Sequence, residues 1–426
     1  MNIHIKNGRV IDPANSIDAK QDVYIVNGKI AGLGQAPAGF QADKTIDASG
    51  LIVAPGLVDL CARLREPGYE YKATLESEMQ AAVQGGVTSL VCPPDTEPVL
   101  DEPGLVEMLK HRARLLNQAN VYPLGALTAG LKGEALTEMA ELTDAGCIAF
   151  SQADHPILDT TVLLRAMQYA QTFGFSVWLR PQDPHVGRSG VAHSGPVASR
   201  LGLPGVSPMS ETLALYTILE LVRATGARVH LCRLSSAAGL ELVRAAKKEG
   251  LPVTCDVGAH HVHLTEIDIG FFDSNARLTP PLRGQRDRDA IRAALLDGTI
   301  DAICSDHAPV DDDEKLLPFG EASAGATGLE LLLSLALKWA EDSRKEVDLP
   351  RALAKITCEP ARIAGLPGGQ LKVGRAADLC LFDPAARWTV AAGALASQGK
   401  HTPFLGYELS GQVKTTIVAG HIAFQR

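Results

Sequence analysis

The amino-acid sequence predicts an α/β protein, a (β/α)8 barrel joined to a small β-sandwich-like domain built from both ends of the chain. Eight apolar, strand-like runs alternate with helical stretches through the middle of the sequence. The two ends instead carry short strand-like segments separated by turns. The length of 426 residues suits one large and one small domain, since a barrel of this kind takes about 250 residues or more.

Each end of the chain has a strand, turn, strand pattern. Residues 3–12 (IHIKNGRVID) and 22–34 (DVYIVNGKIAGLG) place Asn-Gly between apolar alternations, a strong hairpin signal. Residues 377–384 (ADLCLFDP) and 413–426 (VKTTIVAGHIAFQR) repeat the pattern. Neither end has enough strands to bury a face alone. We therefore expect residues 1–50 and 367–426 to pair into one β domain.

Residues 51–366 are expected to form the barrel. Its eight strand-like runs are 52–60, 88–92, 121–128, 147–152, 175–180, 228–235, 253–259 and 300–306. A charged and then Gly/Ala-rich stretch, 311–328, follows the eighth run. It lies on the face where barrel enzymes keep their active sites, so we expect either a mobile flap or a solvated loop there.

Charge and composition exclude several classes of function. Forty Lys and Arg against forty-nine Asp and Glu give a net charge of -9, which lacks the basic excess that nucleic-acid binding requires. No apolar run is long enough for a membrane span, and the N-terminus has no apolar signal segment. The eight cysteines are scattered and never form C-x-x-C, which is typical of buried thiols in a reducing compartment. We expect a soluble, cytoplasmic protein.

The carboxyl ends of the expected barrel strands carry the polar groups of the candidate site. Four arginines converge there with several carboxylates and amides, whereas histidines do not converge. The residues are Asp59, Cys61, Arg63, Arg65, Asp95, Gln152, Arg180, Arg233, Asp256 and Asp306.

Six sequence blocks resemble, in order and spacing, the class I dihydroorotases of the amidohydrolase superfamily. They are VDLCARLREPG (58–68), CPPDTEP (92–98), TPPLR (279–283), DGTIDAICSDHAP (297–309), ARIAGLPGGQLKVGRAADL (361–379) and HTPFLGYELSG (401–411). The resemblance spans nearly the whole chain. It implies the amidohydrolase type of barrel, with a small β domain beside it.

The resemblance also implies where zinc ligands would stand. In that family the metals are held by a His-x-His after the first strand, a bridging carboxylate after the fourth, histidines on the fifth and sixth, and an Asp on the eighth. In this chain those positions are Cys61 and Arg63, Gln152, Arg180, Arg233 and Asp306. Only the last of them matches the family.

This substitution pattern predicts a chain without zinc and without catalytic residues. Arginine carries only donors and stays protonated, so it cannot bind a cation, and a hydrolytic zinc needs about three protein ligands. We therefore expect no cofactor, no enzymatic activity, and arginines that pair with Asp306 and Asp256 in place of the lost metal charge. The alternative is that these arginines extend into solvent.

Substrate recognition is expected to be vestigial. Arg65 matches the family's carboxylate-binding arginine, but Asp95 and Thr279 stand where the family has asparagines, and Val310 replaces a histidine. A replacement metal site in His260, His261 and His263, or a nucleophilic Cys61, is the weaker interpretation of the remaining groups.

Three functions follow as hypotheses. The first is a non-catalytic dihydroorotase homologue that serves as a structural subunit with the aspartate carbamoyltransferase catalytic chain in pyrimidine biosynthesis, since the family contains such companion chains. It would be a homo-oligomer within a hetero-oligomer, without nucleic-acid or membrane partners. The second is a metal-poor amidohydrolase with residual dihydroorotase or related cyclic-amide hydrolase activity. The third is a small-anion sensor.

Overall fold

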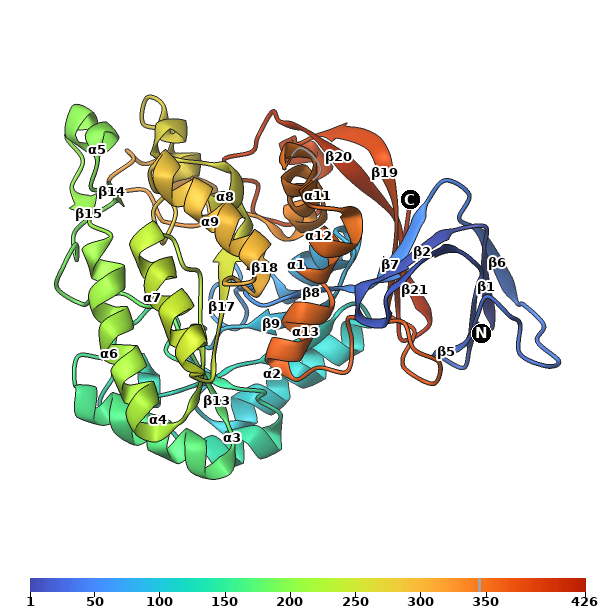
Figure 1. Cartoon of the computed structure of the whole chain (residues 1–426), viewed down its shortest axis with the longest axis horizontal. Helices are drawn as coiled ribbons and strands as arrows, with labels where there is room; N and C mark the ends of the chain where they lie inside the picture. Colours follow the sequence, from blue (N-terminus) through green and yellow to red (C-terminus); the bar gives the residue numbers. More distant parts are fainter. Residues whose placement is uncertain (344–345) are drawn as a thin grey trace.

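Eight parallel strand positions form a barrel in the computed structural model, which describes residues 1–343 and 346–426 (Figure 1). In order around the ring they are β8 (Leu57–Asp59), β9 (Val87–Cys92), β10 (Asn120–Pro123) with β11 (Gly125–Ala126), β12 (Phe150–Ser151), β13 (Ser176–Leu179), β16 (Arg228–Leu231), β17 (Val253–Gly258) and β18 (Ala302–Cys304). The predicted (β/α)8 barrel is therefore confirmed.

Backbone contacts at the strand ends close the ring between the eighth and first strands. Just beyond β18, His307 forms a parallel bridge with Ala62. The N–H of Arg63 donates to the carbonyl of His307 at 2.8 Å, and the N–H of His307 donates to the carbonyl of Cys61 at 3.1 Å. The segments that carry Arg63 and Asp306 are thereby held side by side.

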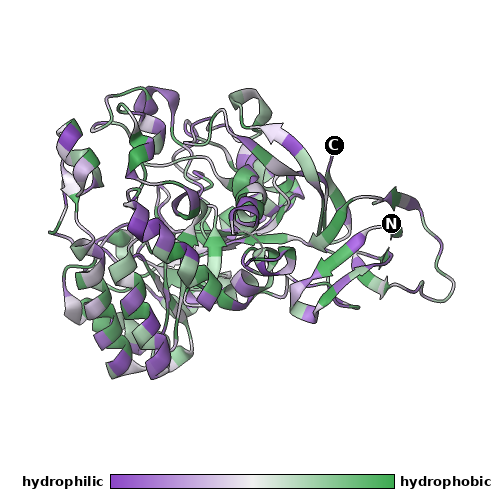
Figure 2. Ribbon diagram, turned by 45° about the horizontal axis from the view of Figure 1, so that its top comes forward, coloured by the Kyte–Doolittle hydropathy of each residue, from purple (hydrophilic) through white to green (hydrophobic). Residues whose placement is uncertain are grey.

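Helices surround the barrel and bury their apolar sides against it, while their outer sides are hydrophilic (Figure 2). The longer ones are α1 (Leu75–Gln84), α2 (Pro103–Leu116), α4 (Thr160–Phe173), α6 (Met209–Thr225), α7 (Ala237–Glu249), α9 (Gln285–Asp297) and α11 (Leu332–Asp342). The shorter ones are α3 (Met139–Ala145), α5 (Pro196–Leu201), α8 (Ala259–His263), α10 (Asp312–Lys315), α12 (Leu349–Ala354) and α13 (Cys358–Ala364). In the part of the chain that the structure describes, no helix is long and apolar enough to cross a membrane.

Local sequence sets the helix ends. Thr74 caps α1 by accepting a hydrogen bond from the N–H of Ser77 at 3.2 Å, and the Ser77 hydroxyl accepts one from the N–H of Thr74. At the other end, α4 and α7 stop at Gly174 and Gly250, which take the left-handed conformation that favours glycine.

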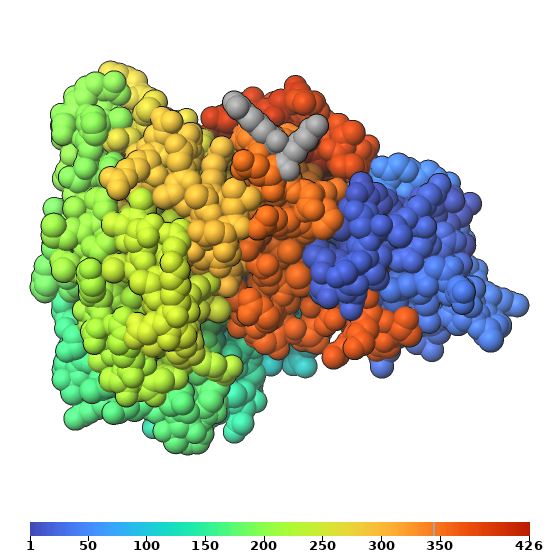
Figure 3. Space-filling view, viewed as in Figure 1, coloured from blue at the N-terminus to red at the C-terminus, as the bar shows by residue number. Residues whose placement is uncertain are grey.

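Both chain ends contribute to a β domain of two sheets beside the barrel, where the blue N-terminal segment lies against the orange and red C-terminal part (Figure 3). One sheet has the order β5 (Lys29–Leu33), β4 (Val23–Val26), β1 (Ile3–Lys6), β6 (Lys44–Asp47). The other has the order β21 (His421–Gln425), β20 (Glu408–Val418), β19 (Leu379–Thr389), β7 (Ile52–Pro55), β2 (Arg9–Asp12), β3 (Ile17–Lys20). Side chains of both sheets share one apolar core. A further short pair, β14 (Ala192–His193) and β15 (Gly205–Val206), lies near α5.

The run 52–60, predicted as one barrel strand, is divided between the two parts of the molecule. β7 pairs with β2 and β19 in the β domain, and only β8 joins the barrel. Gly56 lies between them, and a Cβ there would stand 2.2 Å from Thr88 Oγ1. Because only glycine fits so close an approach, the chain changes sheets at this residue.

Of the two hairpins predicted at Asn-Gly, one is present and the other is not. Asn27 and Gly28 both have positive φ and connect the antiparallel pair β4 and β5. Asn7 also has positive φ, but β1 pairs with β4 and β6 while β2 pairs with β3 and β7. The Asn7 turn therefore carries the chain from one sheet to the other, and the hairpin prediction there was wrong.

The segment 311–328 after the eighth strand is anchored rather than solvated. Lys315 is completely buried. Its ammonium donates to three backbone carbonyls, those of Arg277 at 3.2 Å, Ser323 at 3.0 Å and Gly325 at 2.7 Å. Lys315 thereby joins the loop 311–328 to the segment around Arg277. The loop and this segment together form a wall of the barrel mouth.

The histidines of α8 have structural environments. His261 Nε2 lies 3.2 Å from the carbonyl of Pro281, and His263 Nε2 lies 2.9 Å from that of Leu335. His260 stacks on Phe404 with 5.7 Å between ring centroids. Burial lowers the pKa of His260 to about 3 and that of His261 to about 4. Both rings are therefore neutral in the folded protein near pH 6.

We predict that folding stability is lost as the pH falls from about 6.5 toward 4. The unfolded chain takes up protons on these histidines while the folded chain does not, and each contributes a slope of about 1.4 kcal/mol per pH unit. Chemical denaturation across this range should show a shallower slope for His260→Met than for wild type. The exposed His421→Asn is the control, and equal slopes in all three proteins would contradict the prediction.

Candidate active site

The barrel mouth contains a cavity of about 420 Å³ at the carboxyl ends of the strands. Charged side chains from several strands line it, together with the wall formed by residues 323–326. The charged groups are Arg63, Arg65, Lys72, Asp95, Asp154, Arg180, Arg188, Arg277 and Asp306. Arg233 lies beneath them and is 3% exposed. The arginines predicted from the strand ends therefore do converge on one site.

Three arginines share the carboxylate of Asp154. Arg63 Nη2 donates to Oδ2 at 2.7 Å, while Arg180 Nε and Arg233 Nη2 both donate to Oδ1. Burial disfavours the charged carboxylate, but the three guanidinium groups outweigh it and hold the pKa of Asp154 well below its usual range. Asp154 is therefore ionised and joins the ends of β8, β12, β13 and β16.

Asp306, just after β18, is the second acidic centre. Its Oδ1 accepts from Arg233 Nη1 at 3.0 Å, and the Cys61 thiol lies 3.9 Å from the same oxygen. Burial, only partly offset by Arg233 and Arg63, raises the pKa of Asp306. The expected pairing of an arginine with Asp306 is thus present, and the arginines do not extend freely into solvent.

The expected pairing with Asp256 was wrong. Asp256 accepts from the backbone N–H of Arg233 at 2.5 Å and lies 3.1 Å from His230 Nε2. The Arg233 side chain turns instead to Asp154 and Asp306. Asp154 was missed because it belongs to no recognised block, although its place two residues after Gln152 in SQAD was a signal that it lies in the mouth.

The residues at the former ligand positions do not fit a zinc ion. Arg63, Arg180 and Arg233 offer no lone pairs. Gln152 is occupied at both ends: its Oε1 accepts from Thr128 Oγ1 at 3.0 Å and its Nε2 donates to the carbonyl of Leu131 at 2.9 Å. Within residues 1–343 and 346–426, no three His, Cys, Asp or Glu side chains gather closely enough to hold a metal ion. Cys61 and Asp306 alone fall short of the three ligands that a hydrolytic zinc requires.

Cys61 is also unsuited to act as a nucleophile. The thiol is buried, and this burial outweighs the nearby Arg233 and Arg63 and raises its pKa above the usual value. A thiolate is the reactive form, so Cys61 remains protonated near neutral pH.

All three of the expected vestigial substrate residues have defined partners in the structure. Asp95 accepts from Arg63 Nε at 2.7 Å, so its charge is paired rather than free to repel an anion. The backbone carbonyl of Thr279 accepts from Arg233 Nη1 at 3.3 Å. Arg65 donates through Nε to the carbonyl of Pro309 at 2.9 Å, and it lines the cavity.

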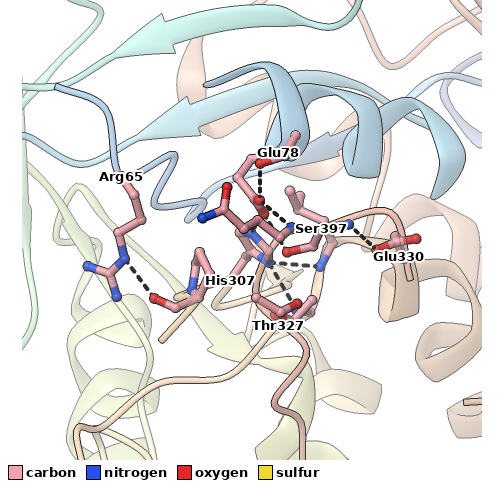
Figure 4. Close-up of polar contacts among 12 residues, drawn as sticks. Arg65, Glu78, His307, Thr327, Glu330 and Ser397 are labelled. Carbon is pink, nitrogen blue, oxygen red and sulfur yellow. Dashed lines mark hydrogen bonds and ion pairs between the residues drawn. The ribbon is translucent and has the colours of Figure 1, made fainter. Parts of the chain in front are cut away.

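A buried network supports the strand that carries Asp306 (Figure 4). His307 Nδ1 accepts from the N–H of Gly328 at 3.1 Å, which leaves its Nε2 to donate to Glu78 at 2.6 Å. Glu78 also accepts from the Ser397 hydroxyl at 2.7 Å. Because both His307 and Glu78 are fully buried, this network fixes the loop on which Asp306 stands and ties it to α1 and to the segment before β20.

Comparison with known proteins decides the family. Residues 50–238 match the dihydro-orotase-like family and residues 224–424 match the amidohydrolase family. The chain is 47% identical over 425 residues to a dihydroorotase-like protein of Pseudomonas aeruginosa, covering all of both chains. It is 41% identical over 425 residues to a dihydroorotase of Citrifermentans bemidjiense, again end to end. The chain belongs to the dihydroorotase-like amidohydrolases.

Solved structures confirm the fold of this dihydroorotase-like chain. The L-hydantoinase of Arthrobacter aurescens matches with a TM-score of 0.88 at 23% identity, over 99% of this chain and 96% of that one. A D-hydantoinase matches with a TM-score of 0.84 at 22% identity, over 100% and 96%.

The comparisons contradict the prediction that this chain is not an enzyme. Relatives that match it from end to end at 41% identity are named dihydroorotase, and the similar solved structures carry the names of enzymes. The chemistry of the mouth argues against the family's zinc ligand set. It does not argue against every form of hydrolysis.

We predict that Asp154→Asn destabilises the fold by about 3 kcal/mol, because it leaves three arginines without their shared carboxylate. Urea denaturation followed by circular dichroism measures the loss. Asp144→Asn, an exposed aspartate on α3, should change stability by less than about 0.5 kcal/mol. Equal stability of the two variants would contradict the role assigned to Asp154.

Proposed function

We propose that this chain is a metal-poor amidohydrolase that opens a small anionic cyclic amide of the dihydroorotate type in the barrel mouth. Its relatives named dihydroorotase support the reaction class. The cation-lined cavity of about 420 Å³ supports a small, negatively charged substrate, because guanidinium groups bind carboxylates with charge-assisted hydrogen bonds.

The observation that carries the proposal is the environment of Asp306. It is a buried carboxylate with a raised pKa, it lines the cavity, and its Oδ2 has no hydrogen-bond partner among the described residues. A carboxylate of raised pKa is a better general base near neutral pH than an ordinary one. Arg233 on Oδ1 keeps the group oriented.

The reaction balances with the side chains of this chain and one water molecule. Asp306 takes a proton from the water molecule while the water oxygen forms a bond to the amide carbon. The charge that develops on the carbonyl oxygen is stabilised by the guanidinium groups of Arg63 and Arg180, which line the cavity. The C–N bond then breaks, and Asp306 returns the proton to the leaving nitrogen. Arg65 holds an acid group of the substrate.

We predict that the purified chain hydrolyses dihydroorotate and that Asp306→Asn lowers the rate by about a hundredfold or more. The base must be ionised to act, and the pKa of Asp306 is raised. The wild-type rate should therefore fall on acidification at a higher pH than it would with an aspartate of ordinary pKa. A pH–rate profile by ultraviolet absorbance measures both effects. Asp144→Asn is the control.

Two results would overturn this proposal. One is wild-type protein without hydrolysis of dihydroorotate or other cyclic amides at any pH. The other is an Asp306→Asn variant that is folded and as active as wild type.

We also propose that the chain associates with the aspartate carbamoyltransferase catalytic chain. The resemblance to companion chains of that transferase supports the identity of the partner. An apolar stripe on α6 supports a contact: Met209, Leu213 and Tyr216 lie on one helical face and are 57%, 40% and 57% exposed. Catalytic activity and such an association are compatible.

We predict that the two chains co-elute in size-exclusion chromatography and that Leu213→Glu disrupts the complex by placing a charge in the stripe. Leu115→Glu changes a leucine that is 71% exposed on α2 and should leave the complex intact. Separate elution of the wild-type chains, or equal effects of the two variants, would reject this partner.

A further inference from the structure

Arg277 is a cation in the mouth for which the structure provides no counter-ion. It lies on the segment between β17 and α9 and lines the cavity. In the described ranges no carboxylate comes within 4.0 Å of it, and its only side-chain hydrogen bond is a long one, 3.4 Å from Nη1 to the carbonyl of Leu278. Its Nε is buried without any acceptor. A buried donor left unpaired is costly and rare, which points to a missing partner.

The backbone around Arg277 is fixed, so its side chain is held at the cavity. The Arg277 carbonyl accepts from the N–H of Gly325 at 3.0 Å and from the buried Lys315 ammonium at 3.2 Å. These contacts join the Arg277 backbone to the loop 311–328. Burial lowers the pKa of Arg277 without any compensating carboxylate, yet arginine stays protonated in proteins.

Three other arginines of the mouth do have carboxylate partners. Arg63, Arg180 and Arg233 are all paired with carboxylates. Arg65 has only the carbonyl of Pro309 as a partner. Arg65, Arg188 and Arg277 are thus the cavity-lining guanidinium groups without carboxylates among the described residues, and of these Arg188 is exposed while Arg65 and Arg277 are partly buried.

Arg65 and Arg277 both line the cavity that Asp306 also lines. Arg65 follows β8 and Arg277 follows β17, and β18 lies between those strands in the ring. A ligand with one acid group at each arginine would lie in the cavity that Asp306 also lines.

We propose that Arg277 binds a second acid group, a carboxylate or a phosphate, of the ligand that occupies the mouth. The ligand therefore carries two acid groups, one at Arg65 and one at Arg277, as does the ring-opened product of a cyclic amide that has one acid group of its own. This inference rests on the proposed function and deepens it, because hydrolysis of a cyclic amide creates a second carboxylate and Arg277 is assigned to hold it in that same site. No contact within the described residues competes for the Arg277 guanidinium except the long one to Leu278.

The test compares binding of succinate, inorganic phosphate and acetate at constant ionic strength by isothermal titration calorimetry. Wild type should bind succinate at least tenfold more tightly than acetate, because two charge-assisted pairs form instead of one. Arg277→Gln should weaken succinate about tenfold and leave acetate nearly unchanged. Arg277→Lys, which keeps the charge, should recover part of the difference.

Matched controls keep the result interpretable. Arg114→Gln removes an exposed arginine at the end of α2, away from the mouth, and should bind succinate like wild type. Circular dichroism and a thermal melt establish that the Arg277 variants are folded. Binding of phosphate that is tighter than that of succinate and depends on Arg277 would assign a phosphate as the second acid group.

Two outcomes overturn the inference: wild type binds succinate and acetate equally, or folded Arg277→Gln binds succinate as tightly as wild type. Succinate is not hydrolysed, so these measurements are independent of turnover. A chain that binds succinate through Arg277 and hydrolyses nothing would reject the proposed hydrolase and keep this site.

Discussion

The shared carboxylate of Asp154 is the interaction on which the mouth of this barrel depends. Three arginines from three strands would repel one another if they converged without an anion between them. Asp154 binds all three, and Asp306 binds Arg233 from the other side. The strand ends of the barrel are therefore held together by ion pairs between side chains.

Given these ion pairs, loss of the zinc ligands and loss of catalytic activity are two separate questions. Guanidinium groups at the former ligand positions argue against the zinc set that the family resemblance implies. They do not remove a base, an electrophile or a cavity, since Asp306 and the arginines themselves can serve these purposes. The error in predicting an inactive chain was to equate the loss of one catalytic device with the loss of all activity, and relatives named dihydroorotase correct it.

The sequence was sufficient for the architecture because strand runs, turn residues and family blocks all agree on it. It was insufficient where a single residue determines which of two neighbouring sheets the next strand joins. Gly56 transfers the chain from one sheet to another, and Asn7 turns it between sheets rather than within a hairpin. Periodicity alone does not distinguish these cases, since both flanking segments are strands in either arrangement.

In the site, the sequence likewise predicted which residues lie close together but not which side chains pair. Strand-end positions correctly predicted that Arg63, Arg180 and Arg233 meet, because the carboxyl ends of parallel strands share one face. The direction of each side chain depends on its partners in space. Asp256 is already occupied by His230 and the backbone of Arg233, so the arginine side chain uses Asp154 instead. No spacing rule reveals such a choice.

The arginines of the mouth balance its carboxylates and leave too few ligands for the family's metal centre. The most direct test is an anomalous difference map at the zinc absorption edge, from crystals grown with excess zinc. We expect no peak within the mouth, and side chains of Arg63, Arg180 and Arg233 that are directed at Asp154. A strong peak among Cys61, Gln152 and Asp306, with the arginines displaced, would contradict it.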